Sequence, residues 1–322
     1  MRYRPLGSTG IMVSAIGFGA WGIGGCTPGA TSYGETDDQE SLRALNAAFD
    51  HGITFYDTSN VYGDGHSEEL IGACFAGRRS DVIIATKAGI TASYRGYDFH
   101  PAALRTSLED SLRRMRTDYV DVLQLHNGTP DTVMGSSELV ELMQRFVAEG
   151  KVRCWGISTL SPDDALALID VAGVGCFQVN CNILDWRAID AGLPGAAASR
   201  GIGVIARTPL ASGFLAGGIG KDTMFPANDH RSKWPRDRIV TWIDAAQAVV
   251  GSVNLADTPE NRAALALRFC LSVDGVATVI PGMLTRREVL ASVAACERGP
   301  LGRDVMLSIE GVYRRYEARL GA

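Results

Sequence analysis

The stretch at residues 82–87 reads VIIATK, an apolar run over residues 82–85 that leads into a lysine. Comparable apolar runs of about 4–7 residues recur along the chain and are typical of strands that are buried on both faces. An early strand near residues 15–19 brings the expected number of strands to eight. The other runs lie at residues 53–56, 119–125, 152–157, 176–179, 204–206 and 277–280.

Amphipathic stretches separate these runs. Residues 104–115 repeat leucine at a spacing of four, which predicts a helix with one apolar face, and residues 41–50 and 138–149 follow a similar pattern. Ser161 and Thr258 each precede a proline and an acidic residue, which is a signal for the start of a helix. Strand and helix therefore alternate along the chain. This order predicts an α/β fold, a (β/α)8 TIM barrel with parallel strands.

The barrel is expected to carry two additions and to form one domain over residues 1–322. Residues 2–14 predict a β-hairpin before the first barrel strand, and extra helices follow the later strands. A doubly wound sheet is the competing fold, but no GxGxxG motif follows the first strand. The irregular segment at residues 217–237 is long enough to be a lid or a binding loop.

Composition excludes several functional classes. The chain of 322 residues has 31 basic and 36 acidic residues, so its net charge of −5 argues against a basic surface for nucleic acid. No apolar run reaches the ~18 residues that a membrane span needs. The seven cysteines form no CxxC pair and show no zinc-ligand spacing with histidine. We expect a cytoplasmic protein with free thiols, no metal, and no nucleic-acid or membrane partner.

Polar side chains stand where three neighbouring strands end. These residues are Asp57, Lys87 and His126, and Tyr62 follows shortly after Asp57. In such a barrel the carboxyl ends of the strands surround one mouth, so we expect the four side chains to converge. Each residue alone has an ordinary structural explanation, but the four together at successive strand ends indicate an active site.

The chemistry of this group follows from charge. A lysine at the end of a buried strand is costly unless a carboxylate pairs with it, and Asp57 is the available partner. A nearby cation favours the phenolate, so we expect the pKa of Tyr62 to fall from ~10 toward neutrality. Tyr62 would then act as a general acid near pH 7, while His126 donates a hydrogen bond to a carbonyl oxygen.

At this point the chain resembles the aldo-keto reductase family. The resemblance implies that Asp57, Tyr62, Lys87 and His126 are the catalytic residues, and that hydride passes between a nicotinamide dinucleotide and an aldehyde, ketone or sugar, or the corresponding alcohol. It implies a small-molecule substrate and leaves the oligomeric state undetermined. The matching stretches run from residue 4 to about 290: RPLGSTGIMVSAIGFGAW, GITFYDTSNVYGDGHSEELIG, IIATKAG, SLRRMRTDYVDVLQLH, GKVRCWGIS, PLASGFLAG and VIPG.

The resemblance also implies which residues hold the cofactor and the substrate. The cofactor residues lie in four parts of the chain: Gly19, Ala20, Trp21 and Asp57; Ser158 and Gln178; Arg207, Thr208, Pro209, Leu210, Ala211, Ser212 and Gly213; and Gly282, Met283, Arg286, Arg287 and Glu288. The substrate would contact Trp21, Tyr62, His126 and Asn127, with Tyr33, Tyr94 and Trp186 as further candidates for the pocket wall.

The match is weakest where the family binds the 2′-phosphate of NADP. Leu284 stands where relatives often have arginine, and Glu288 stands where others have arginine or glutamine. Arg286 and Arg287 lie in the same turn, at an expected helix start where a phosphate is welcome. On this basis NADP(H) is favoured over NAD(H), and Glu288 is alternatively expected to cap the turn.

Two other functions are compatible with these residues. The same fold and cofactor site occur in the β subunits of potassium channels, which would make the protein a cofactor-binding regulatory subunit. A barrel aldolase would use Lys87 as a Schiff-base nucleophile, but pairing with Asp57 would keep that lysine protonated.

Overall fold

The computed structural model describes residues 1–29 and 31–320, and its centre is a sheet of eight parallel strands. The sheet closes on itself because Ile16 bridges Val279 and Gly19 bridges Gly282. The prediction of a (β/α)8 barrel is confirmed. In their order around the barrel, the strands are β3 (Phe18–Gly19), β4 (Phe55–Asp57), β5 (Ile83–Ala88), β6 (Val120–His126), β7 (Val152–Ser158), β8 (Val174–Asn180), β9 (Gly203–Arg207) and β10 (Val276–Ile280).

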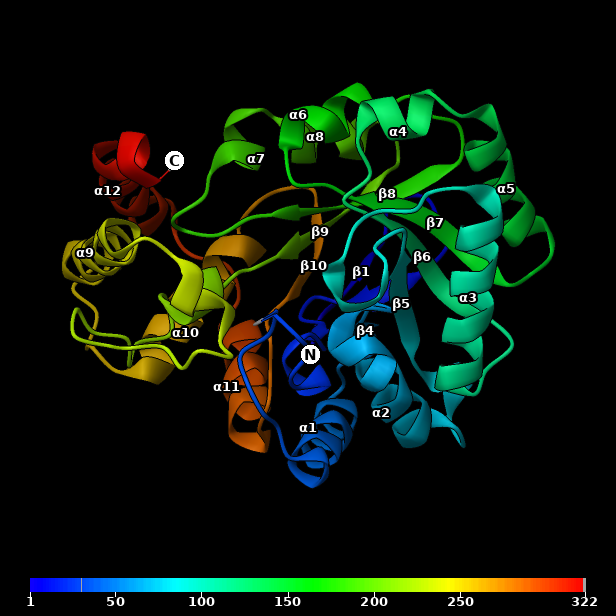
Figure 1. Ribbon diagram of the computed structural model, residues 1–322. Helices are drawn as coiled ribbons and strands as arrows, with labels where there is room; N and C mark the ends of the chain where they lie inside the picture. Colours follow the sequence, from blue (N-terminus) through cyan, green and yellow to red (C-terminus); the bar gives the residue numbers. More distant parts are fainter. Residues whose placement is uncertain (30, 321–322) are drawn as a thin grey trace.

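Helices surround the barrel, and α9 and α12 pack against each other outside it, after the later strands as expected (Figure 1). Ser161 and Thr258 cap helices as predicted, because their side chains accept hydrogen bonds from backbone amides. The helices are α1 (Asp38–Asp50), α2 (His66–Phe75), α3 (Pro101–Met115), α4 (Pro130–Met134), α5 (Ser137–Ala148), α6 (Pro162–Ala167), α7 (Arg187–Asp190), α8 (Leu193–Ser199), α9 (Arg236–Ser252), α10 (Pro259–Leu271), α11 (Arg286–Glu297) and α12 (Arg303–Leu320).

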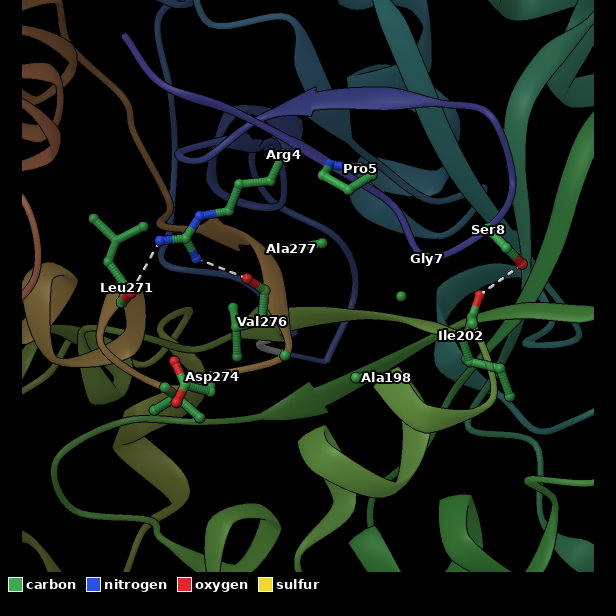
Figure 2. Close-up of a pocket in the computed structure, with 14 residues that line it drawn as sticks. Arg4, Pro5, Gly7, Ser8, Ala198, Ile202, Leu271, Asp274, Val276 and Ala277 are labelled. Carbon is green, nitrogen blue, oxygen red and sulfur yellow. Dashed lines mark hydrogen bonds between the residues drawn. The ribbon is translucent and has the colours of Figure 1, made fainter.

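The expected hairpin is present before the barrel. Strands β1 (Tyr3–Pro5) and β2 (Met12–Ser14) pair antiparallel, and the hairpin closes the barrel at the amino ends of the strands. A cavity of about 480 Å³ lies beside it, where the Arg4 guanidinium donates hydrogen bonds to the carbonyl oxygens of Val276 at 2.7 Å and Leu271 at 3.0 Å (Figure 2). These contacts join the hairpin to the end of α10 and the start of β10. This end of a TIM barrel supports stability rather than catalysis.

Apolar and polar side chains divide the barrel interior into two levels. Beside the hairpin it is filled by side chains such as Leu6, Phe55 and Val122, which form one closely packed cluster. Toward the carboxyl ends of the strands the buried residues become polar, with Lys87 and Gln124 fully buried. Because burying polar groups is costly unless they are hydrogen-bonded, this level of the barrel is where a functional site is expected.

The segment predicted as irregular at residues 217–237 is irregular up to residue 235, with one short 3₁₀ helix, η6 (His230–Lys233), and its last two residues begin α9. It crosses the chain near Ser32, whose carbonyl oxygen accepts a hydrogen bond from the His230 backbone amide at 2.8 Å. Within residues 1–29 and 31–320, no helix combines the length and apolar character needed to cross a bilayer.

Candidate active site

The Lys87 ammonium is the centre of the site. From the end of β5, its Nζ donates to Asp57 Oδ1 at 2.5 Å, to the Thr58 carbonyl oxygen at 2.8 Å and to Tyr62 Oη at 3.1 Å. The Lys87 side chain is fully buried. Since an ammonium has three hydrogens, these bonds use all of them. Tyr62 Oη therefore accepts from Lys87 and keeps its own proton for another partner.

Two amide side chains hold the carboxylate of Asp57 in place. Gln178 Nε2 donates to Asp57 Oδ2 at 2.7 Å, and Gln124 Nε2 donates to the same oxygen at 3.0 Å. Gln178 Nε2 also donates to Gln124 Oε1 at 3.0 Å. The buried carboxylate thus has an ion pair and two further hydrogen bonds, which offset the cost of burying its charge. The role of Gln124 was not predicted, although a glutamine in the apolar stretch VDVLQLH was a visible signal.

A tight turn presents Tyr62 to this ammonium. Tyr62 opens the 3₁₀ turn η2 (Tyr62–Gly65), in which Gly63 has φ +63° and Gly65 has φ +102°. A Cβ atom on Gly63 would lie 2.1 Å from the carbonyl oxygen of Gly24, so a larger residue there would force the backbone apart. The motif YGDG therefore fixes where the phenol points.

The prediction that the pKa of Tyr62 falls toward neutrality is wrong. Burial raises the pKa of Tyr62 above its ordinary value, and the negative charge of Asp57 raises it further, while Arg207 opposes the shift. Lys87 does not reverse this shift because the Asp57 carboxylate at 2.5 Å offsets the charge of its ammonium. The phenol is therefore protonated throughout the neutral range.

His126 ends β6 and faces the same phenol. Its ring centre lies 6.0 Å from that of Tyr62, in an edge-to-face arrangement. Its Nδ1 lies 3.1 Å from Ser59 Oγ. Burial lowers the pKa of His126 well below its usual value, and the charges of Lys87 and Arg207 lower it further. The imidazole is therefore neutral near pH 7.

Aromatic side chains form one wall of the mouth. The Trp21 ring centre lies 4.8 Å from those of Tyr33 and His230, and 6.4 Å from that of Tyr62. His230 comes from the 217–237 segment and was missed, because sequence alone did not show which residue of this segment reaches Trp21. Tyr94 ends the short 3₁₀ helix η4 (Ala92–Tyr94), which contacts the η2 turn that carries Tyr62.

Asn127 and Trp186 are the remaining predicted substrate residues. Asn127 follows His126 with φ +60°, its Nδ2 donates to Tyr97 Oη at 3.2 Å, and its buried Oδ1 has no partner among the described residues. Trp186 is a wrong prediction for the pocket wall. Its ring stacks on Tyr313 with centres 5.5 Å apart, and its Nε1 donates to the Ile183 carbonyl oxygen, so it packs beneath α12 instead.

Arg207, at the end of β9, holds three neighbouring groups. Its Nε donates to Asn180 Oδ1 at 2.9 Å, its Nη1 to Ser158 Oγ at 3.2 Å and its Nη2 to the Thr159 carbonyl oxygen at 3.0 Å. These bonds fix the plane of the guanidinium across the ends of β7, β8 and β9. Sequence analysis missed the role of Asn180 in this arrangement.

The turn that follows Arg207 has an unusual backbone. Thr208, Ala211, Ser212 and Gly213 all have φ between +46° and +95°. The amides of Ala211 and Gly213 donate to the carbonyl oxygens of Thr208 and Leu210, whereas none of the described residues accepts a hydrogen bond from the Ser212 amide. Left-handed residues in such turns aim amides at a common point, which is how backbone binds anions.

A cavity of about 530 Å³ joins two of the predicted cofactor segments. Leu210 and Gly217 line it from one side, and Gly282, Glu288 and Ser292 line it from the other. Residues that lie 65 or more positions apart in the sequence thus face each other across one space. Met283 is almost fully buried and contributes to the core rather than to this cavity.

The start of α11 shows how the charges near this cavity are used. Thr285 and Glu288 form a capping box, and Glu288 Oε2 accepts from the amides of Leu284 at 2.7 Å and Thr285 at 2.9 Å. The expectation that Glu288 caps the turn is therefore confirmed. Arg287 forms an ion pair with Glu260, whereas Arg286 is exposed and makes no ion pair among the described residues.

Known sequences resemble the chain over most of its length. A model described as "Aldo/keto reductase family" matches residues 15–314. The aldo-keto reductase YhdN of Bacillus subtilis is 32% identical, with 85% of this chain and 82% of the relative covered. L-galactose dehydrogenase of Arabidopsis thaliana is 32% identical, with 94% of this chain and 90% of the relative covered. A probable voltage-gated potassium channel subunit beta of the same plant is 29% identical, with 95% of this chain and 94% of the relative covered.

Solved structures resemble the chain over nearly its whole length. The holo form of the aldo-keto reductase AKR11C1 from Bacillus halodurans has a TM-score of 0.78 and 28% identity, and the match covers 97% of this chain and 96% of that one. An aldo/keto reductase from Klebsiella pneumoniae in complex with NADP and acetate has a TM-score of 0.70 and 26% identity, with 97% and 96% covered.

Proposed function

Since the chain belongs to the aldo/keto reductase family, and so to the oxidoreductases, we propose that it transfers a hydride reversibly between NADP(H) and a carbonyl or alcohol substrate, with Tyr62 as general acid and base. The observation that carries this proposal is the Lys87 ammonium, 2.5 Å from Asp57 Oδ1 and 3.1 Å from Tyr62 Oη at the mouth of the barrel. Schiff-base chemistry at Lys87 is disfavoured because all three ammonium hydrogens are engaged.

In the proposed reduction, Tyr62 gives its proton to the carbonyl oxygen. Because Tyr62 Oη accepts from Lys87, its own hydrogen is free to point into the pocket. His126 would donate from Nε2 to the same oxygen in the tautomer in which Ser59 Oγ donates to Nδ1. In that tautomer the single Ser59 hydroxyl hydrogen leaves Asn60 Oδ1, which is 3.1 Å from the same Oγ. Lys87 and Asp57 orient the phenol, and the wall that contains Trp21 limits access of water.

The residues present fit a nicotinamide dinucleotide. When bound, the reduced nicotinamide would supply the hydride. Ser158 Oγ and Gln178 Oε1 would hold the carboxamide, since the two Nε2 hydrogens of Gln178 are already engaged by Asp57 and Gln124. The Arg207 guanidinium would lie against the ring, and the unpaired Ser212 amide would bind a pyrophosphate oxygen. The cavity of about 530 Å³ would take the adenosine end.

The direct test of the proposed function is oxidation of NADPH by a carbonyl panel that includes 4-nitrobenzaldehyde, simple ketones and sugars. We expect a decrease in absorbance of NADPH that depends on both enzyme and carbonyl. L-galactose dehydrogenase and the glycerol dehydrogenase AKR11B4 from Gluconobacter oxydans act, by name, on hydroxylated substrates, so the matching alcohols belong in the panel with oxidised cofactor. Absence of turnover in both directions, with intact cofactor binding, would favour the regulatory-subunit alternative that the potassium channel relatives suggest.

Preference for NADPH is expected to depend on the arginines at the start of α11. Replacing both Arg286 and Arg287 by alanine should weaken the binding of NADPH about tenfold and the binding of NADH by less than about twofold, because only NADPH carries the 2′-phosphate. Fluorescence titration with each cofactor measures this without turnover. Arg298→Ala, at the other end of α11, removes one positive charge from the same helix and serves as the control for charge alone. Equal weakening of both cofactors would show that neither arginine contacts the 2′-phosphate.

The two directions of the reaction should differ in their pH dependence. The pKa of Tyr62 is raised, so the protonated phenol needed for reduction is present across about pH 6–9 and kcat for reduction should stay nearly constant there. Alcohol oxidation needs the phenolate, so its kcat should rise about tenfold per pH unit over the same range. A plateau in the oxidation profile at neutral pH would contradict the raised pKa. Steady-state rates at saturating substrate in both directions provide the measurement.

A further inference from the structure

A second cavity touches the turn that follows Arg207. It has a volume of about 330 Å³ and meets this turn at Thr208, Ala211 and Ser212. It shares no lining residue with the 530 Å³ cavity, so it is a separate space beside the same turn. The rest of its wall comes from the end of β8 and the loop and short helix α7 that follow it, from Trp234, from α9 and from α12.

An arginine without an acidic partner lines this cavity. The Arg238 guanidinium carbon lies 4.5 Å from the ring centre of Trp234 and 5.0 Å from that of Trp242. Among residues 1–29 and 31–320, no carboxylate pairs with Arg238, and its buried Nε has no hydrogen-bond acceptor. Trp242 Nε1, one helical turn further along α9, is also buried without an acceptor. Two aromatic faces therefore hold a cation whose buried Nε has no acceptor.

This position is unfavourable for a cation in three respects. Arg238 lies in the first turn of α9, where the helix macrodipole disfavours positive charge. Burial lowers the pKa of Arg238, and the nearby Arg187 lowers it further. Asp185 and Arg187 also line the cavity and are paired with each other at 2.6 Å, so together with Arg238 they carry a formal charge of about +1. A bound anion would offset these costs by pairing with the positive charge of Arg238.

We propose that this cavity binds a small oxyanion, a phosphate or a carboxylate, through the Arg238 guanidinium. Asn182 and Ser212 line the same space and can supply hydrogen bonds. The cavity is separate from the proposed catalytic residues, but it is connected to Arg207. Asn180 Oδ1 accepts hydrogen bonds from Thr208 Oγ1 and from Arg207 Nε. Occupancy of the cavity should therefore change the affinity of the neighbouring turn for its own ligand.

Calorimetric titration of the protein with inorganic phosphate tests the site without any measurement of activity. We expect saturable binding that Arg238→Gln weakens at least about tenfold, because a charge-assisted bond to phosphate is lost. Arg236→Gln is the matched control, since it removes the same charge from the same turn of α9 but Arg236 does not line the cavity. Arg287→Gln controls for phosphate binding in the 530 Å³ cavity.

Several outcomes would overturn the proposal. They are absence of saturable binding to the wild-type protein, equal weakening by Arg236→Gln, or weakening by Arg287→Gln alone. Circular dichroism checks that Arg238→Gln is folded. If it is not, Arg238→Lys keeps the charge but loses the planar donors, and phosphate binding within the error of wild type would then contradict the assigned contact.

Competition kinetics distinguish the two sources of such an anion. If the phosphate group of a substrate uses the cavity, inorganic phosphate should raise KM for glyceraldehyde 3-phosphate and leave KM for glyceraldehyde unchanged. If a free anion is the ligand, phosphate should shift cofactor affinity equally with either aldehyde. Both outcomes require Arg238, and the calorimetric result stands even if neither aldehyde is a substrate.

Discussion

Tyr62→Phe is expected to lower kcat for carbonyl reduction by roughly a hundredfold to ten-thousandfold, the range found when a positioned proton donor is lost. The substitution removes only the hydroxyl that accepts from Lys87 Nζ at 3.1 Å, and the ring remains against Trp21 and His126. Cofactor affinity should therefore change by less than about twofold. Stopped-flow reduction rates and fluorescence titration of NADPH separate the two effects.

Tyr119→Phe is the matched control for this variant. Tyr119 lies just before β6, at the opposite end of the barrel, and the substitution also removes one phenol hydroxyl. It should leave kcat within about twofold of wild type. If Tyr62→Phe reduced carbonyls at the wild-type rate, Tyr62 would not be the acid, and a water molecule or His126 would have to supply the proton.

Lys87→Met should abolish most activity near neutral pH, with kcat reduced by about a hundredfold or more. The phenol would lose the donor that orients it, and the nearby charge of Asp57 would no longer be offset, so the phenolate would become still harder to form. An unpaired buried carboxylate is also destabilising, by about 3–5 kcal/mol. Thermal unfolding must therefore be measured beside the rates.

The double variant Asp57→Asn with Lys87→Met separates stability from catalysis. It removes both members of the buried ion pair, and Gln124 and Gln178 can still bond to the new side chain through an amide oxygen. We expect most of the stability to return while activity stays low. Recovery of activity together with stability would mean that Lys87 acts only by holding the barrel together. Full activity of the single variant would contradict any role for the ammonium.

The fold was predictable because its signals are local and repeated. Each barrel strand is a short apolar run, and each observed strand overlaps a predicted one, as VIIATK overlaps β5 (Ile83–Ala88). Parallel strands bring their carboxyl ends to one rim, so a residue at the end of a run is placed with little more information. Asp57, Lys87 and His126 could be grouped in this way. Their catalytic roles, the extent of one domain over residues 1–322, the cytoplasmic location and the absence of a metal stay predictions.

The wrong and missing predictions concern side chains whose neighbours come from distant parts of the sequence. An aromatic residue in a loop can face the pocket or the core, and Trp186 packs against Phe269 and Tyr313 because α10 and α12 cover it. His230 reaches the wall through a loop of about 20 residues, for which sequence offers no register. Arg287 is paired with Glu260, a residue 27 positions away on α10, and no local pattern indicates that pairing.

By itself, the sequence determined the order of strands and helices and the strand ends at which Asp57, Lys87 and His126 stand, because strand periodicity and helix caps depend on neighbouring residues. Tertiary structure alone decided that Gln124 and Gln178 converge on Asp57, and that the pKa of Tyr62 is raised rather than lowered. Burial and charge act through space with a strength set by distance and local polarity. Those quantities exist only once distant segments of the chain have been packed together.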